Sequence, residues 1–198
     1  MRIVRQASFK AVPWKNGGGI THEAIRVPAH GDPFRWRVSV ARIDASGPFS
    51  DFSGYDRKMI LLKGGGVVLR FADGAVRALR AVGDLVEFDG AHAAQCDLVG
   101  GPCVDLNLIA AKALSGVSAQ VARFESLTLP AAAAAGRATL AFPIDAAVEI
   151  SRGSERAALE AWDLAVIPGG SELTLRVARG GGSQAPRVAA VFLANLPE

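Results

Sequence analysis

The sequence predicts an all-β protein made of two similar halves, each a small barrel of antiparallel strands. Three observations support this prediction. Short apolar or alternating stretches of strand length recur along the whole chain, and glycine, proline or aspartate separates them. No stretch has the length and periodicity of an ordinary helix. Finally, one stretch of the first half has a counterpart in the second half, which indicates two copies of one β unit.

The clearest strand lies at residues 34–41, where apolar side chains at even positions alternate with Arg35, Arg37 and Ser39 at odd positions. This period of two gives the strand two differently composed faces. Further strands are expected at residues 21–27, 58–63, 67–71, 84–88, 104–109, 120–124, 138–142, 148–150, 163–167, 173–177 and 187–193. Glycine triplets at 64–66 and 180–182 and the pair Asp73-Gly74 are typical of hairpin turns. Short helical turns are expected at 110–114 and 130–136.

The repeated stretch begins with an aspartate and ends in a glycine turn. GDLVEFDG at residues 83–90 resembles WDLAVIPG at residues 162–169, 79 positions later. The pattern is similar to the second conserved stretch of cupins, in which a glycine-aspartate strand enters a turn that often carries a metal-binding histidine. We therefore expect a double cupin-like barrel (a bicupin of the RmlC-like jelly-roll type). Its halves would be residues 1–112 and 113–198, packed as one compact unit.

The histidines argue against a metal centre of the cupin kind. Such a centre normally uses two histidines one residue apart, a glutamate slightly downstream and a third histidine after the second turn. The chain has only His22, His30 and His92, with no closely spaced pair, and only His92 follows the repeated glycine-aspartate turn. One ligand does not hold an ion. The sequence therefore predicts no metal, no cofactor and no assigned catalytic residue.

Composition limits the cellular compartment and the classes of binding partner that we expect. Half of the 198 residues are hydrophobic and 21% are charged, as in globular proteins. The net charge is +3 and the basic residues are scattered rather than clustered, which argues against a nucleic-acid partner. Three basic residues among the first ten interrupt any signal-peptide core, and the longest apolar run, 188–194, is too short to span a membrane. Cys96 and Cys103 match no redox or zinc spacing, so we expect two free thiols in a cytoplasmic protein.

Polar side chains crowd into the segment WKNGGGITHE at residues 14–23, which leads into an expected strand. Its glycines allow backbone N–H groups to approach a ligand closely, and Lys15 and Asn16 are suited to a carboxylate or a carbonyl. The alternative is a tight turn whose Asn16 and Thr21 side chains satisfy their own backbone. Two further dense segments follow, FRWRVSVARI at 34–43 and GPFSDFSGYDR at 47–57.

These segments resemble the HutD family, also called HutD/Ves, of bacterial double-cupin proteins. The family pattern W-x-N-G-x-G-x-T-x-E falls on residues 14–23, F-x-W-R-x-S-x-A on 34–41, G-P-F-S-x-F-x-G-x-D-R on 47–57 and D-L-N-L on 105–108. The second half of the chain matches only in the rhythm of its strands. The resemblance implies a protein associated with histidine utilisation that binds a small carboxylate such as N-formylglutamate. It also implies that the protein moderates the pathway rather than catalysing a step.

The polar loop and the family pattern together give a set of expected ligand-binding residues. They are Lys15, Asn16, Thr21, Glu23, Trp36, Arg37, Ser39, Ser50, Asp56, Arg57 and Asn107. Either arginine can pair with a carboxylate through two hydrogen bonds, and Asn16 and Thr21 can read an amide or a formyl group. Trp36 would supply an apolar wall.

Two points about this set stay open at the level of sequence. Trp36 and Arg37 point to opposite faces of one strand, so one of them is structural unless a bulge intervenes, and the face of Arg37 and Ser39 is the more polar candidate. Asp56 and Arg57 can contact a ligand, or they can form an ion pair that fixes the turn before them.

Two other functions remain possible from the sequence. The protein could be a metal-independent isomerase or hydrolase, with Glu23 or Asp56 as the base and Arg57 as electrostatic support. It could instead be an interaction module that binds a protein through an exposed apolar patch. A homodimer formed through edge strands is compatible with any of these functions.

Overall fold

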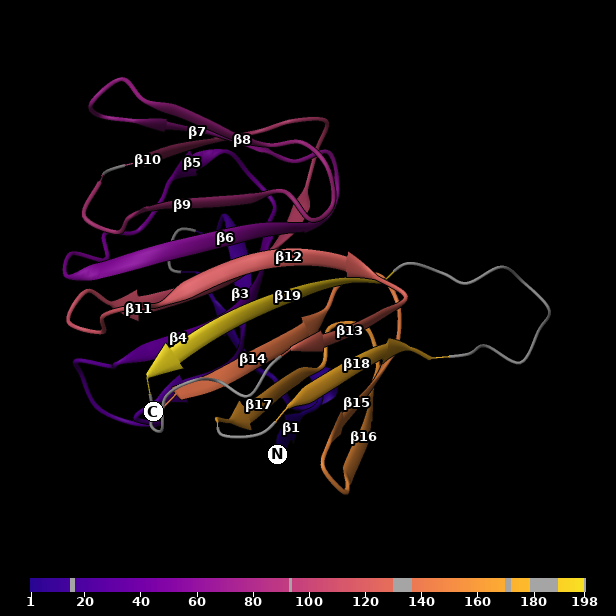
Figure 1. Cartoon of the computed structure of the whole chain (residues 1–198). Coiled ribbons are helices and arrows are strands. Elements are labelled where there is room, and N and C mark those ends of the chain that lie inside the picture. The colour runs from indigo at the N-terminus through magenta and orange to yellow at the C-terminus, as the bar shows by residue number, and fades with distance from the viewer. Residues whose placement is uncertain (15–16, 93, 130–136, 170–171, 179–188, 198) are drawn as a thin grey trace. The chain divides into compact units, whose positions relative to one another are not determined.

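A computed structural model of the chain describes residues 1–14, 17–92, 94–129, 137–169, 172–178 and 189–197. Over these residues the protein consists of nineteen strands and one 3-10 turn, η1 (Gln6–Ser8) (Figure 1), which confirms the all-β prediction. The strands form two units: an N-terminal unit, Ser8–Leu114, and a C-terminal unit, Met1–Ala7 with Ser115–Glu198. Among the described residues, no helix has the length and apolar character needed to cross a membrane.

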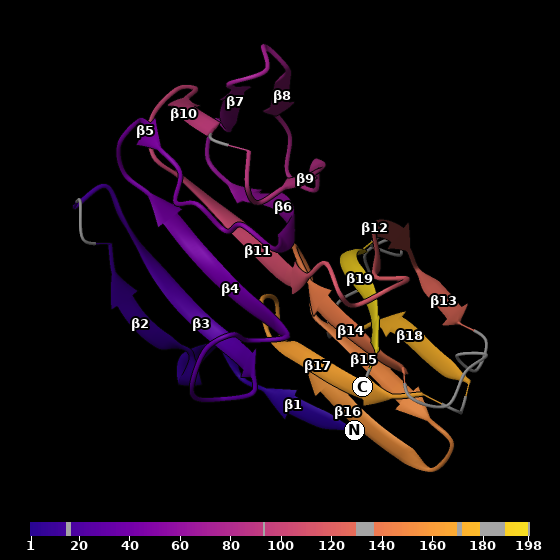
Figure 2. The same cartoon turned by 90° about the vertical axis from the view of Figure 1, so that its left-hand side faces the viewer.

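The N-terminal unit contains two antiparallel sheets. The first has six strands in the order β2 (Lys10–Pro13), β3 (Gly19–Val27), β4 (Trp36–Ile43), β11 (Cys103–Ala111), β6 (Tyr55–Lys63) and β9 (Leu85–Asp89). The second has the order β5 (Gly47–Pro48), β10 (Ala94–Leu98), β7 (Val67–Phe71) and β8 (Val76–Leu79). Figure 2 shows β2, β3, β4 and β11 side by side. Buried residues of both sheets form one apolar cluster, so the sheets face each other across a common core.

The C-terminal unit repeats this two-sheet plan. One sheet has the order β1 (Arg2–Val4), β17 (Leu164–Pro168), β14 (Arg137–Pro143), β19 (Ala189–Pro197) and β12 (Ser118–Phe124). The other has the order β13 (Ser126–Leu129), β18 (Leu173–Val177), β15 (Val148–Arg152) and β16 (Glu155–Leu159). The N-terminal strand β1 pairs antiparallel with β17. The first residues of the chain therefore complete a sheet whose other strands all lie after residue 117.

The repeated glycine-aspartate stretch has the same structural role in both units. Asp84 lies just before β9 and Asp163 just before β17, and in each case Oδ2 accepts a hydrogen bond from the backbone N–H three residues earlier, at 2.9 and 3.0 Å. The residue before each aspartate has a positive φ, 92° at Gly83 and 72° at Trp162. Each aspartate thus closes a tight turn at the entry to the strand that follows it.

Three expected turns had different outcomes. Asp73-Gly74 does join the paired strands β7 and β8, and Gly74 has a φ of +86°. Residues 64–66 are not a hairpin turn, because β6 and β7 lie in different sheets and the segment carries the chain from one sheet to the other. At Gly66 a Cβ atom would lie 2.0 Å from the Leu79 carbonyl oxygen, so this close crossing requires glycine. The third expected turn, at the glycine triplet 180–182, lies outside the described residues.

The helical turn expected at 110–114 is only partly confirmed: Ala110 and Ala111 are the last residues of β11, and a single turn follows, in which the Leu114 N–H donates to the Ala111 carbonyl oxygen at 2.9 Å. The one expected at 130–136 lies outside the described residues. Sequence analysis also missed several short strands: β1, β2, β5, β8, β13 and β16, which are outermost in their sheets, and β10, which lies between β5 and β7. Edge strands are partly solvated and need few apolar residues, so their sequences lack the alternation that reveals the central strands.

Asp163 provides a test of how strongly the N-terminal segment is held. Its carboxylate is 5% exposed. It accepts hydrogen bonds from Arg5 Nη1 at 2.6 Å and from the Gln6 backbone N–H at 2.9 Å, and it closes the turn before β17. We expect Asp163→Ala to lower the free energy of unfolding by about 2–4 kcal/mol, because these donors lose a buried acceptor. Urea denaturation measures the change. The matched control is Asp97→Ala, which removes an exposed pair with Arg70 and should cost less than about 1 kcal/mol; equal losses would contradict the prediction.

Candidate functional site

The core-facing side of the six-stranded sheet carries an unusual group of polar residues. Ile43 on β4 and Met59 on β6 belong to the core cluster, and residues two and four positions away along a strand share their face. Strand alternation and the observed register therefore place a set of polar residues on this face. We name this set the polar cluster: Arg37, Ser39, Arg57, Asp105 and Asn107.

A chain of hydrogen bonds links three members of the polar cluster. Arg57 Nη2 donates to Asn107 Oδ1 at 2.8 Å. Asn107 Nδ2 donates in turn to Asp105 Oδ2. The Asn107 amide is thereby held in one orientation, between a buried cation and a buried carboxyl group. All three side chains are buried, and Asp105 is fully so.

Three buried atoms of the polar cluster lack a hydrogen-bond partner. They are Arg37 Nε, Arg57 Nε and Asp105 Oδ1, and within the described ranges no other buried side-chain nitrogen or oxygen is in this position. An unsatisfied buried polar group costs about 1–3 kcal/mol, more when it is charged. Such groups call for an explanation such as a bound molecule. Their concentration in one place makes the polar cluster the candidate functional site.

Aromatic rings surround the buried guanidinium groups. The Arg57 guanidinium carbon lies 5.0–5.2 Å from the ring centroids of Phe49, Phe52 and Phe88. The Arg37 guanidinium carbon lies 5.2 Å from the Phe52 centroid as well. Cation–π attraction compensates part of the cost of burying these charges. Because both guanidinium groups face one ring, they lie within about 10 Å of each other.

Burial shifts the ionisation of the polar cluster. It raises the pKa of Asp105 to about 7, although the nearby Arg57 opposes this change. It lowers the pKa of Arg57 to about 10, with Asp105 acting in the opposite direction. It also lowers the pKa of Arg37, and Glu23 on β3 acts against that shift. Arg57 therefore stays charged at neutral pH while the carboxyl group beside it is partly protonated, so the cluster favours an additional anion.

The structure brings together several residues that the sequence suggested. Arg37, Ser39, Arg57 and Asn107 form four of the five members of the polar cluster, and Glu23 lies directly across from Ser39 on the neighbouring strand. Thr21 lies on the same strand as Glu23, and its hydroxyl accepts a hydrogen bond from Trp14 Nε1 at 2.8 Å. This bond links the residue after β2 to β3.

Other suggested residues lie elsewhere. Trp36 and Asp56 point to the opposite face of the six-stranded sheet, Trp36 buried and Asp56 exposed. Asp56 and Arg57 therefore do not form the ion pair considered as their alternative role, because neighbouring residues of a strand face opposite ways. Ser50 is exposed in the segment after β5. We exclude Trp36, Asp56 and Ser50 from the candidate site; Lys15 and Asn16 lie outside the described residues.

The sequence also contained a signal for the member that it did not single out. Asp105 is two positions before Asn107 in the motif D-L-N-L, and a period of two places both side chains on one face. The apolar wall comes from phenylalanines of the loop segment 49–52 and of β9, not from Trp36.

The residues present do not fit a cupin metal centre. His92 is exposed, and its ring lies 6.4 Å from that of Phe71. Within the described part of the chain, no three His, Cys, Asp or Glu side chains come together as a metal site would require. Arg57 is buried in the same unit, and the positive charge of its guanidinium group would repel a metal cation placed beside it.

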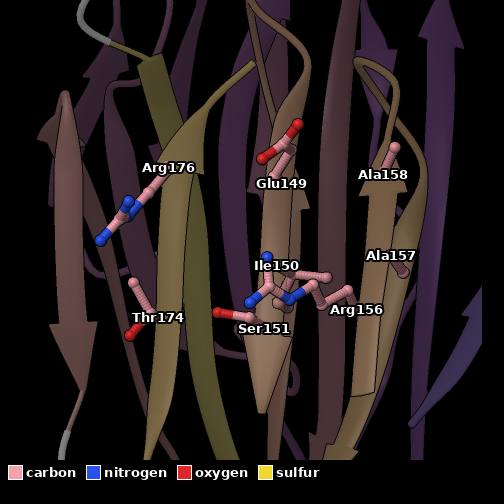
Figure 3. Close-up of a pocket in the computed structure, with 8 residues that line it drawn as sticks. All are labelled: Glu149, Ile150, Ser151, Arg156, Ala157, Ala158, Thr174 and Arg176. Atoms are coloured by element: carbon pink, nitrogen blue, oxygen red, sulfur yellow. The ribbon is translucent and has the colours of Figure 1, made fainter. Parts of the chain in front are cut away.

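The C-terminal unit has an open hollow of about 440 Å³ on the sheet that contains β15, β16 and β18. Figure 3 shows Arg156 extending from β16 toward Ser151, with Glu149 and Arg176 nearby on β15 and β18. The charged side chains here are solvent-exposed, so water satisfies them without a ligand. The hollow therefore carries weaker support for a binding site than the buried polar cluster does.

The ionisation of Asp105 predicts a specific dependence of stability on pH. Its pKa in the folded protein is about 7 against an ordinary value of 3.8, so the folded protein binds this proton more tightly than the unfolded chain does. The resulting stabilisation is complete below about pH 4 and is lost as the pH rises through 7. Through this group the free energy of unfolding of the wild type should fall by up to about 4 kcal/mol between pH 4 and pH 8. Asp105→Asn should not show this fall, because the amide does not ionise. Urea denaturation of both proteins across this range measures it; parallel pH profiles would contradict the prediction.

Comparison with known proteins places the chain in a family. The HutD family model matches residues 6–184. An uncharacterized 21.2 kDa protein in the hutC 3' region of Pseudomonas putida is 40% identical over 110 residues, which are 55% of this chain; the match spans only 57% of that relative's length.

Solved structures agree with this assignment. A conserved protein of unknown function from Pseudomonas aeruginosa PAO1 is 30% identical, with a TM-score of 0.85 over 100% of this chain and 98% of that chain. HutD from Pseudomonas fluorescens SBW25, in a formate condition, is 27% identical, with a TM-score of 0.72 over 97% of each chain. A variant of Bacillus subtilis oxalate decarboxylase, 8% identical, shows the cupin-like fold alone, with a TM-score of 0.64 over 100% of this chain and 77% of that one. Together with the observed sheets, these matches confirm the expected double cupin-like fold, and the chain belongs to the HutD family.

Proposed function

We propose that the protein binds a small carboxylate metabolite such as N-formylglutamate at the polar cluster, and that it moderates histidine utilisation in the cytoplasm without catalysing a step. Membership of the HutD family and the relative in the hutC 3' region support the association with histidine utilisation. The single observation that carries the site is the unpartnered Nε of the buried Arg57. A guanidinium group without a full counter-charge in the core is suited to an anionic ligand.

The geometry suits a molecule with more than one carboxylate. Arg57 and Arg37 both face Phe52 at 5.2 Å, so two positive groups lie within the span of one small dicarboxylate. The planar guanidinium group pairs with a carboxylate through two parallel hydrogen bonds. Ser39, next to Asn107 across the strand pair, offers a hydroxyl that can bond to an amide or formyl group. The phenylalanine rings supply the apolar wall that such sites commonly have.

Isothermal titration calorimetry with N-formyl-L-glutamate tests this proposal, with urocanate and formate as comparison ligands. We expect saturable binding to one site, and Arg57→Met should weaken it about 10- to 100-fold because a charge-assisted hydrogen bond is lost. Arg37→Ala should also weaken it. The control is Arg70→Met, which removes an exposed arginine of the same unit that pairs with Asp97; it should bind like the wild type.

The outcome that would reject this function is the absence of heat of binding at millimolar N-formyl-L-glutamate with folded protein. Equal weakening by Arg57→Met and Arg70→Met would reject the polar cluster as the site. Either result leaves the fold and the family assignment unchanged.

A second candidate function is a metal-independent isomerase or hydrolase. The observation that favours it is the pKa of Asp105, which burial raises to about 7 and which therefore suits general acid–base catalysis near neutral pH. In this case Asp105 takes the role considered for Glu23 or Asp56. NMR spectra of N-formyl-L-glutamate after prolonged incubation with the protein separate the two functions: a binder returns the ligand unchanged, whereas an enzyme yields a new set of resonances.

A further inference from the structure

Asp105 is buried in a way that the binding of a carboxylate by Arg57 does not by itself require. Its side chain has no solvent exposure. One oxygen, Oδ2, accepts a hydrogen bond from Asn107, while the other, Oδ1, has no partner. Arg57 is the cation that acts on it. In the ligand-free protein Asp105 therefore serves as the internal counter-charge of Arg57.

An anionic ligand changes this balance. When a carboxylate pairs with Arg57, the guanidinium group has a new counter-ion, and the Asp105 carboxylate becomes a second negative charge in a water-poor interior. Two like charges in such a site cannot both stay ionised without a large cost. Protonation of Asp105 removes that cost.

We propose that Asp105 takes up one proton from solvent when a carboxylate ligand pairs with Arg57, so that ligand binding is coupled to pH. This inference rests on the function proposed above. The proton forms one O–H bond at Oδ1, since Oδ2 remains the acceptor for Asn107. No electrons are transferred and no other bond changes. Oδ1 thereby becomes a donor that can face the incoming ligand.

Asp105, rather than any titratable group near it, is the expected acceptor of the proton. Arg57 on β6 is its cation, and Cys96 on β10 and Cys103 on its own strand also lie in its electrostatic field. Burial raises the pKa of each thiol to about 12, so neither changes its protonation near neutrality. Glu23 on β3 acts on the other guanidinium group. The residues directly opposite Asp105 on β4 and β6 are apolar.

The direction of the effect follows from linkage. Below pH 7 Asp105 carries its proton in both the free and the bound protein, and affinity is at its full value. Above pH 7 the free protein has an ionised Asp105, so binding requires the uptake of a proton from the solvent. The proton concentration of the solvent falls as the pH rises, and affinity falls with it. With a pKa of about 7 in the free protein, the dissociation constant should be about tenfold larger at pH 8 than at pH 6.

Calorimetry with N-formyl-L-glutamate tests the coupling. Titrations at pH 6 and pH 8 give the change in affinity, and titrations at pH 8 in phosphate and Tris, which differ in protonation enthalpy, give the number of protons taken up. We expect close to one proton at pH 8 for the wild type. Asp105→Asn, which resembles the protonated acid, should bind equally at both pH values and take up none. Asp97→Asn, a substitution in the exposed pair with Arg70, should behave like the wild type.

A second measurement does not depend on the folding of a variant. The carbon-13 resonance of the Asp105 carboxyl group in wild-type protein at pH 8 should move to its protonated position when N-formyl-L-glutamate saturates the site. Binding of equal affinity at pH 6 and pH 8, with an unchanged resonance, would overturn the coupling and leave the proposed function standing. No binding at either pH would overturn the proposed function, and the coupling with it.

Discussion

The burial of Arg57 is the constraint on which the N-terminal unit depends. A guanidinium group with 6% exposure needs compensation for its lost hydration. Three phenylalanine rings, the Asn107 amide and the Asp105 carboxyl group together provide it. The compensation is incomplete, since Nε has no partner. That deficit distinguishes this interior from an ordinary hydrophobic core.

The two units show how one plan supports different interiors. Each has a pair of facing antiparallel sheets, and in each an aspartate closes the turn before an equivalent strand. Among the described residues of the C-terminal unit, Asp163 is the only buried polar or charged side chain, and it closes the turn before β17. The N-terminal unit combines an apolar core with a charged region on the same sheet face.

A buried arginine places a fixed positive charge inside the N-terminal unit. In cupin metal centres the ion supplies the positive charge, and histidines position it. Here Arg57 carries the charge on a side chain that cannot be removed by chelation, and Asn107 positions it. The guanidinium plane adds directional pairing with carboxylates. The charge of Arg57 also lies close to Asp105, and in the proposed mechanism this closeness couples ligand binding to pH.

The sequence by itself determined the all-β class, the duplicated plan and most central strands, because alternation and tight turns are local properties of the chain. It also determined that Arg37 and Ser39 share a face that Trp36 does not, since a strand has a period of two. Only the tertiary structure decided that Arg57, Asn107 and Asp105 meet. Arg57 lies on β6 and the other two on β11, some 50 residues later, and the pairing of these two strands depends on sheet register, which no local pattern specifies. The pKa of Asp105 was equally beyond the sequence, because burial within the folded unit causes it.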